Sequence, residues 1–124
     1  MPKSILLVDD EPDVVLVIRG RLTTWGYRVV TATNGQEALD AMNKQAPDLI
    51  LMDLKMPVMD GSEVCRRLKT DPRFSHIPII LITSSSPKTA TEEYLDIQAD
   101  DCVIKPFEPK ELLEKVEKWI GKPA

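Results

Sequence analysis

The stretch LILMD at residues 49–53 decides the fold class of this chain, because four consecutive apolar residues are followed by a single carboxylate, Asp53. A run that is apolar at consecutive positions, and not at alternate ones, is typical of a strand buried on both faces. Such strands belong to parallel sheets that helices cover on both sides. We therefore predict a buried strand here, with Asp53 at its carboxyl end.

Similar apolar runs lie on either side of this stretch, separated by longer amphipathic segments. These runs are ILLV at residues 5–8, VV at 29–30, IILI at 79–82 and CVI at 102–104. Strand-like runs that alternate with helical segments five times indicate βαβ units with right-handed crossovers. We expect an α/β fold with a five-stranded parallel sheet.

The expected helices have recognisable ends, because proline is tolerated in a first turn and glycine caps a last one. Helices are expected from after Asp10 to near Trp25-Gly26, from after Asn34-Gly35 to before Pro47, from after Asp60-Gly61 to near Asp71-Pro72, from Pro87, and from Pro109 to Gly121. The apolar residues of the last helix fall on one stripe, and both tryptophans are expected to add core area. That stripe is Leu112, Leu113, Val116, Trp119 and Ile120.

The composition is that of one soluble globular domain. The 124 residues are 43% hydrophobic and 29% charged, with a net charge of −4, which gives no electrostatic footprint for nucleic acid or an anionic membrane. Cys65 and Cys102 lack metal-ligand spacing and suit a reducing cytosol. We expect a single cytoplasmic domain over residues 1–124, with no output domain and no binding to nucleic acid or membrane.

Polar residues gather at the predicted carboxyl ends of the strands, where open α/β sheets bind ligands. They are Asp9 and Asp10 after the first strand, Asp53 after the third, Thr83 and Ser84 after the fourth, and Lys105 after the fifth. Clustered carboxylates bind hard cations such as Mg²⁺, and a carboxylate can be the nucleophile of phosphoryl transfer. A lysine and hydroxyl groups neutralise charge on the transferred group. Each feature alone is commonly a cap or a polar turn, and their joint occurrence at four strand ends indicates a site.

The chain resembles the receiver domain of bacterial response regulators. The matching motifs are ILLVDDE at 5–11, DLILMDLKMP at 48–57, MDG at 59–61, IPIILIT at 77–83, ADD at 99–101 and KPF at 105–107. They follow the family order over nearly the whole chain. The resemblance implies a flavodoxin-like, doubly wound (βα)5 fold with strand order 2-1-3-4-5. It also implies a phosphoacceptor switch of a two-component phosphorelay that assists its own phosphorylation and autodephosphorylation and is not otherwise an enzyme.

The resemblance implies a role for each acidic residue. Asp53 corresponds to the phosphoacceptor, and Asp9, Asp10 and Asp53, with the main-chain carbonyl of Lys55, correspond to the Mg²⁺ ligands. The implied phosphodonor is a phosphohistidine of a sensor histidine kinase or of a histidine phosphotransfer protein. The implied output is control of a downstream effector, and the family leaves room for a dimer that forms on phosphorylation.

The remaining site residues resemble the family's switch. Thr83, with Ser84 beside it, corresponds to the hydroxyl that turns toward the phosphoryl group, and Lys105 corresponds to the lysine that pairs with phosphoryl oxygens. The peptide bond from Lys105 to Pro106 is expected to be cis.

Two positions depart from the family pattern. Cys102 stands where an aromatic residue is usual, three residues before Lys105. We therefore expect the change on phosphorylation in the loop after Thr83 and in the fourth helix. Gln98 stands where glycine is usual, and glutamine tolerates a left-handed helix cap poorly.

Three other functions compete with this one. A phosphohydrolase that forms an aspartyl phosphate would need a second aspartate at the position of Lys55. A flavin-binding module would need a Ser/Thr/Gly-rich phosphate loop where Asp9 and Asp10 stand. A degenerate receiver used only as an interaction module would not need the complete acidic and lysine set.

The first helix offers a candidate docking surface for the phosphodonor. A core stripe through Val14, Val17, Ile18 and Leu22 would leave Val15 and Leu16 outward. Both are apolar where a solvated face would be polar, although scattered surface apolar residues are common.

Overall fold

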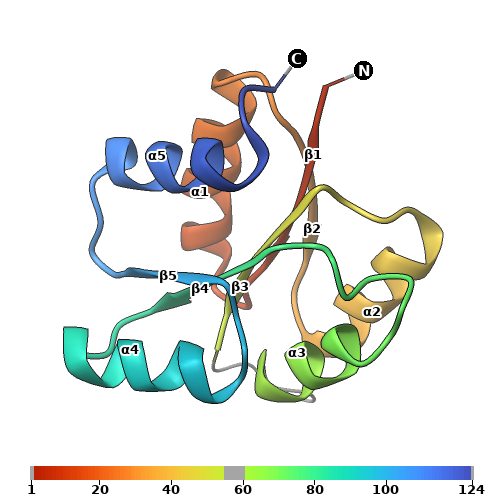
Figure 1. The fold of residues 1–124 in the computed structure, drawn as a ribbon. Coiled ribbons are helices and arrows are strands. Elements are labelled where there is room, and N and C mark those ends of the chain that lie inside the picture. The colour runs from red at the N-terminus through yellow and green to blue at the C-terminus, as the bar shows by residue number, and fades with distance from the viewer. Residues whose placement is uncertain (1, 55–60, 124) are drawn as a thin grey trace.

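Strands and helices alternate along the chain in the computed structural model, which describes residues 2–54 and 61–123 (Figure 1). The strands are β1 (Ser4–Val8), β2 (Arg28–Ala32), β3 (Leu49–Asp53), β4 (Ile79–Thr83) and β5 (Asp101–Ile104). The helices are α1 (Pro12–Thr24), α2 (Gly35–Lys44), α3 (Gly61–Lys69), α4 (Pro87–Asp96) and α5 (Pro109–Ile120). The expected α/β fold is confirmed.

The five strands form one parallel sheet in the order β2-β1-β3-β4-β5, as expected. Ile5 of β1 lies opposite Leu49 of β3, and Ile50 of β3 lies opposite Ile79 of β4. Every residue of β3 is buried. The stretch LILMD is therefore the centre of the sheet, and because all strands run the same way, their carboxyl ends meet at one edge.

Helices cover both faces of the sheet, so the core has two layers. Helices α1 and α5 lie on one face, and α2, α3 and α4 lie on the other (Figure 1). Alternate strand residues point to opposite layers. Ile5, Leu7 and Leu51 pack with Ile18 of α1 and Val116 of α5. On the other face the strand residues Leu6, Val8, Ile50 and Met52 pack with Ala38, Met42, Val64 and Leu68.

Val30 and Trp119 are more exposed than the sequence suggests. Val30 is 45% exposed because β2 is an edge strand of the sheet. Trp119 was predicted to add core area but is 36% exposed. Its indole N–H donates to Oδ2 of Asp101 at 3.0 Å, so the ring lies across the outside of β5 and α5.

The ends of the helices have the capping residues that the sequence predicts. Proline is present at the start of α1, α4 and α5, and Gly121 follows α5 at φ 75°. The side chains of Asn34 and Ser86 cap α2 and α4. Gln98, after α4, adopts the left-handed conformation at φ 61°, which costs a residue with a Cβ about 1–2 kcal/mol.

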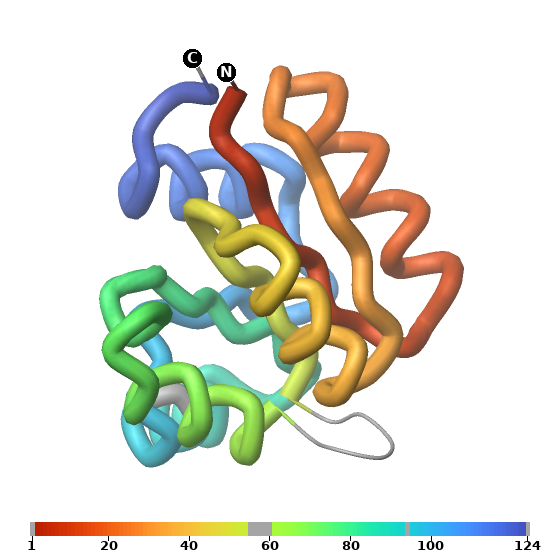
Figure 2. The backbone as a smooth tube through the Cα atoms, turned by 90° about the vertical axis from the view of Figure 1, so that its right-hand side faces the viewer, coloured from red at the N-terminus to blue at the C-terminus, as the bar shows by residue number. Residues whose placement is uncertain are grey.

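The first and last described segments lie side by side (Figure 2). The main-chain N–H of Lys3 donates to the carbonyl of Pro123 at 2.8 Å. The Tyr27 hydroxyl donates to the carbonyl of Gly121 at 2.7 Å. These contacts fasten the tail to the amino end of the sheet. Within residues 2–54 and 61–123, no helix combines the length and apolar character that spanning a membrane requires.

Candidate functional site

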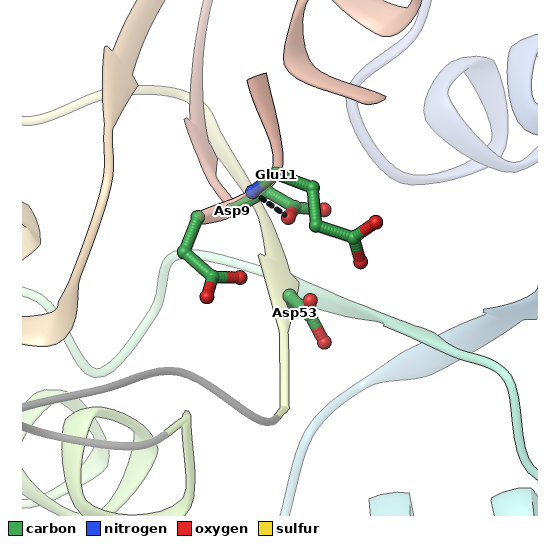
Figure 3. A group of neighbouring side chains, drawn as sticks. Asp9, Glu11 and Asp53 are labelled. Atoms are coloured by element: carbon green, nitrogen blue, oxygen red, sulfur yellow. Dashed lines mark hydrogen bonds between the residues drawn. The ribbon is translucent and has the colours of Figure 1, made fainter. Parts of the chain in front are cut away.

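Four carboxylates meet at the carboxyl edge of the sheet. Asp9, Asp10 and Glu11 follow β1, Asp53 ends β3, and one oxygen of each lies within 4.8 Å of the others. Figure 3 shows Asp9, Glu11 and Asp53, with the hydrogen bond of 3.0 Å from the Glu11 N–H to Oδ1 of Asp9. Asp9 is fully buried and Asp53 is 8% exposed, whereas Asp10 and Glu11 are exposed. The sequence predicted the three aspartates together, and the structure adds Glu11.

The ammonium group of Lys105 faces this cluster. Its Nζ lies 3.5 Å from Oδ2 of Asp9, 3.5 Å from Oε1 of Glu11 and 3.7 Å from Oδ2 of Asp53. Burial alone would lower the pKa of Lys105, but the charges of Asp53, Asp9 and Glu11 outweigh it and raise that pKa. The lysine is therefore protonated at neutral pH. Its peptide bond to Pro106 is cis, as expected.

A cavity of about 360 Å³ opens above the acidic cluster. It is lined by Glu11, Asp53, Leu54, Thr83, Ser84, Ser85 and Lys105. The hydroxyls that were predicted to join the site, Thr83 and Ser84, therefore border the same space as Asp53 and Lys105.

The Thr83 hydroxyl has a partner that sequence reasoning missed. Its Oγ1 lies 3.2 Å from Oε1 of Glu93, on α4, and 3.1 Å from Oγ of Ser85. A carboxylate can only accept, so the hydroxyl donates to Glu93. Thr83 is 6% exposed and Glu93 is half-buried, so the contact is partly shielded from water. Thr83 and Glu93 are ten positions apart in the sequence, so no local motif reveals the contact.

Gly61 packs closely against the backbone at the end of β3. Its N–H donates to the Leu54 carbonyl at 2.8 Å. A Cβ at this position would lie 2.9 Å from the Asp53 carbonyl oxygen and 3.0 Å from Leu54 Cα, so only glycine fits without displacement. The sequence marked this residue as part of a motif, but its contact with the strand that carries Asp53 depends on the tertiary fold.

One predicted ligand, the main-chain carbonyl of Lys55, lies outside the described residues. The remaining predicted residues supply what a hard divalent cation prefers, which is several carboxylate oxygens at the rim of a water-accessible hollow. The buried Asp9 and Asp53 would be costly charges without a nearby positive charge, and among residues 2–54 and 61–123 the ammonium group of Lys105 lies within 4 Å of every carboxylate of the cluster except that of Asp10. The residues present therefore fit a bound divalent cation.

Of the two α1 residues expected to point outward, Leu16 does so and Val15 does not, and docking on this helix stays a prediction. Leu16 is 71% exposed, but Val15 is partly buried against the α1 and α5 core layer, whereas Val17, predicted to be in the core, is 63% exposed. At about 100° per residue, the inward direction passes through Ile18 and Leu22. Val15 lies within a quarter turn of that direction and Val17 lies beyond it. Hence Leu16 and Val17 form the outward face of α1.

Comparison with known proteins agrees with this geometry. The chain matches the response regulator receiver domain family over residues 5–117. It is 42% identical over 114 residues to the "Probable transcriptional regulator ycf27" of Porphyra purpurea, covering 92% of this chain and 46% of that protein. It is 38% identical over 117 residues to the alkaline phosphatase synthesis transcriptional regulatory protein PhoP of Bacillus subtilis, covering 94% and 48%. The chain thus spans about half the length of these relatives.

Solved structures extend the comparison. The receiver domain of the sensor histidine kinase PA1611 from Pseudomonas aeruginosa, with a magnesium ion coordinated in its active site cleft, has a TM-score of 0.90 and 34% identity. That match covers 98% of this chain and 100% of the other. With the site at the carboxyl edge of the sheet, these matches show that the chain belongs to the response regulator receiver domains, the phosphoacceptor switches of two-component signalling.

Proposed function

We propose that Asp53 is the residue on which this receiver domain takes up a phosphoryl group. The observation that carries the proposal is the position of its carboxylate, which borders the cavity, lies 3.7 Å from the Lys105 ammonium and belongs to the four-carboxylate cluster. A nucleophile at the rim of a hollow, beside a fixed positive charge, has the arrangement that phosphoryl transfer requires.

The donor is a phosphohistidine of a sensor histidine kinase or of a histidine phosphotransfer protein. A carboxylate oxygen of Asp53 forms a bond to phosphorus, and the bond from phosphorus to the histidine nitrogen breaks. The electron pair of the broken bond goes to the ring nitrogen, where it stays as a lone pair or takes up a proton. Lys105 offsets the charge on the transferred oxygens, and the hydroxyls of Thr83 and Ser84 are donors at the same cavity.

Mg²⁺ is the cation that fits the acidic cluster, with Asp9, Asp10 and Asp53 as its carboxylate ligands and Glu11 at its edge. When bound, it supplies positive charge that offsets the charge on the phosphoryl oxygens. The carboxylates of Asp9 and Asp10 would hold the cation beside Asp53.

The outward face of α1 is the docking surface for the phosphohistidine protein. Leu16 and Val17 are exposed between two hollows of about 260 and 410 Å³. The smaller hollow is bordered by Asp9 and Asp10, and the larger by Lys105. Because both hollows share residues with the phosphorylation site, a partner seated on α1 would bring its histidine to Asp53. The two free thiols of the chain agree with such an exchange taking place in the cytoplasm.

The test is phosphorylation by acetyl phosphate with Mg²⁺, followed by intact-protein mass spectrometry and peptide mapping. We expect one acid-stable, base-labile phosphoryl adduct that requires Mg²⁺ and maps to Asp53. Asp53→Asn should abolish it, whereas Asp40→Asn, an exposed site on α2, should not. Equal labelling of Asp53→Asn and the wild type would refute the assignment.

A further inference from the structure

We propose that Glu93 is a positioning residue of the phosphorylation switch. In the unphosphorylated protein its carboxylate holds the Thr83 hydroxyl on the α4 side, and phosphorylation of Asp53 breaks this contact and releases α4. The inference rests on the function proposed above.

The Thr83 hydroxyl cannot donate to Glu93 and to a phosphoryl group on Asp53 at the same time. A threonine hydroxyl has one proton to donate. In this structure the proton goes to Oε1 of Glu93, with Oγ1 also accepting from the Ser85 N–H at 3.2 Å. A phosphoryl group on Asp53, across the shared cavity, would offer a competing anionic acceptor. Whichever acceptor takes the proton, the other loses its hydrogen bond.

The contact also ties the site to the carboxyl-terminal half of α4. The carbonyl of Glu93 accepts from the N–H of Ile97, the residue that closes the helix. Glu93 therefore links the hydroxyl at the end of β4 to the last turn of α4. Ile97 is followed by Gln98 in its left-handed conformation, so this turn is already strained. Loss of the contact between Glu93 and Thr83 would therefore loosen the last turn of α4, which is next to the strained residue Gln98.

The Glu93 carboxylate also has an electrostatic effect on Cys102, a small residue on β5. Burial raises the pKa of the Cys102 thiol; the charge of Lys115 lowers it, and the charges of Asp101, Glu93 and Glu111 raise it. The Glu93 carboxylate thus acts on the thiol as well as on Thr83.

The experiment measures binding of beryllofluoride, a phosphoryl mimic, in the presence of Mg²⁺ by calorimetry. Glu93→Ala should raise the apparent affinity about five- to tenfold, because Thr83 no longer has to leave a carboxylate partner. Glu93→Gln should stay close to the wild type, since the amide oxygen still accepts the bond. Glu92→Ala, the neighbouring exposed glutamate on α4, should bind like the wild type.

Two further measurements separate positioning from a general effect on α4. In a Thr83→Val background, Glu93→Ala should change the affinity no further. Hydrogen exchange of residues 93–97 in free Glu93→Ala should already resemble that of the beryllofluoride-bound wild type. An unchanged affinity in Glu93→Ala, or an equal gain in the Thr83→Val background, would overturn the inference while leaving Asp53 as the acceptor. Failure of the wild type to bind beryllofluoride or to accept phosphate would instead overturn the proposed function, and this inference with it.

Discussion

Nζ of Lys105 lies 3.7 Å from Oδ2 of Asp53, although the two residues come from the ends of strands that are not adjacent in the sheet. Strand β4 lies between β3 and β5, so the two side chains meet across the carboxyl end of β4. Among the charges that raise the pKa of Lys105, that of Asp53 has the largest effect.

The first prediction follows from this contact. In Asp53→Asn the pKa of Lys105 should fall toward its ordinary value, measured by NMR titration of its Cε resonance. A lysine whose folded pKa is raised stabilises the fold below its unfolded pKa, and that contribution is lost as the pH rises through the folded pKa. The alkaline loss of stability should therefore be smaller in the variant and be complete at a lower pH. Asp40→Asn should leave the pKa of Lys105 unchanged, and a similar value in Asp53→Asn would disprove the proposed coupling.

The second prediction concerns repulsion within the acidic cluster. Asp10→Asn should lower Mg²⁺ affinity about tenfold or more, since it removes a carboxylate ligand. Without metal, the same change should raise the free energy of unfolding by about 0.5 kcal/mol, as expected for partly exposed charges. Urea unfolding with and without Mg²⁺ measures both effects. Wild-type Mg²⁺ dependence of phosphorylation in this variant would remove Asp10 from the metal site.

The third prediction tests the close approach of Gly61 to β3. Gly61→Ala should destabilise the fold by about 1–3 kcal/mol, because a Cβ 2.9 Å from the Asp53 carbonyl forces backbone movement. It should also slow phosphorylation by moving Asp53. Gly20→Ala is the matched control: nothing lies within 4 Å of its added Cβ, and alanine in α1 should stabilise by about 0.5–1 kcal/mol. Equal effects of the two substitutions on urea unfolding would contradict this account.

The fourth prediction concerns the left-handed residue after α4. Gln98→Gly should raise the free energy of unfolding by about 0.5–1 kcal/mol, because glycine adopts φ 61° without steric cost. Gln45→Gly, at the end of α2 with φ −160°, should lower it instead. Thermal unfolding monitored by circular dichroism distinguishes the two. A gain in both variants would mean that backbone conformation is not the cause.

The fifth prediction tests docking on α1. Leu16→Lys should slow phosphoryl transfer from a phosphohistidine protein about tenfold or more, since a charge would enter an apolar contact. Phosphorylation by acetyl phosphate should be unchanged, because Leu16 is 71% exposed and does not support the site. Leu95→Lys, 61% exposed on α4, should affect neither reaction. Slowing from both donors in Leu16→Lys would indicate a folding defect and not a lost docking contact.

Most of the candidate site was predictable because it is built from strand ends. Once Asp53 and Lys105 are assigned to the ends of parallel strands, their meeting at one edge follows from the sheet. The register of α1 was not predictable, because residues 14–18 (VVLVI) are all apolar. Such a run contains more than one possible stripe, and the sheet decides which one is buried. The contact of Glu93 with Thr83 was missed for a related reason: a glutamate on a helix is usually solvated, and only the packing of α4 turns it inward.

The contact between the first and last described segments has a practical consequence. Lys3 and Pro123 lie at the amino end of the strands, opposite the edge that carries Asp53. A fluorophore, affinity handle or solid support attached at residue 3 or residue 123 would therefore leave the cavity and the outward face of α1 open. Immobilised protein should remain fully accessible to a phosphodonor arriving from solution.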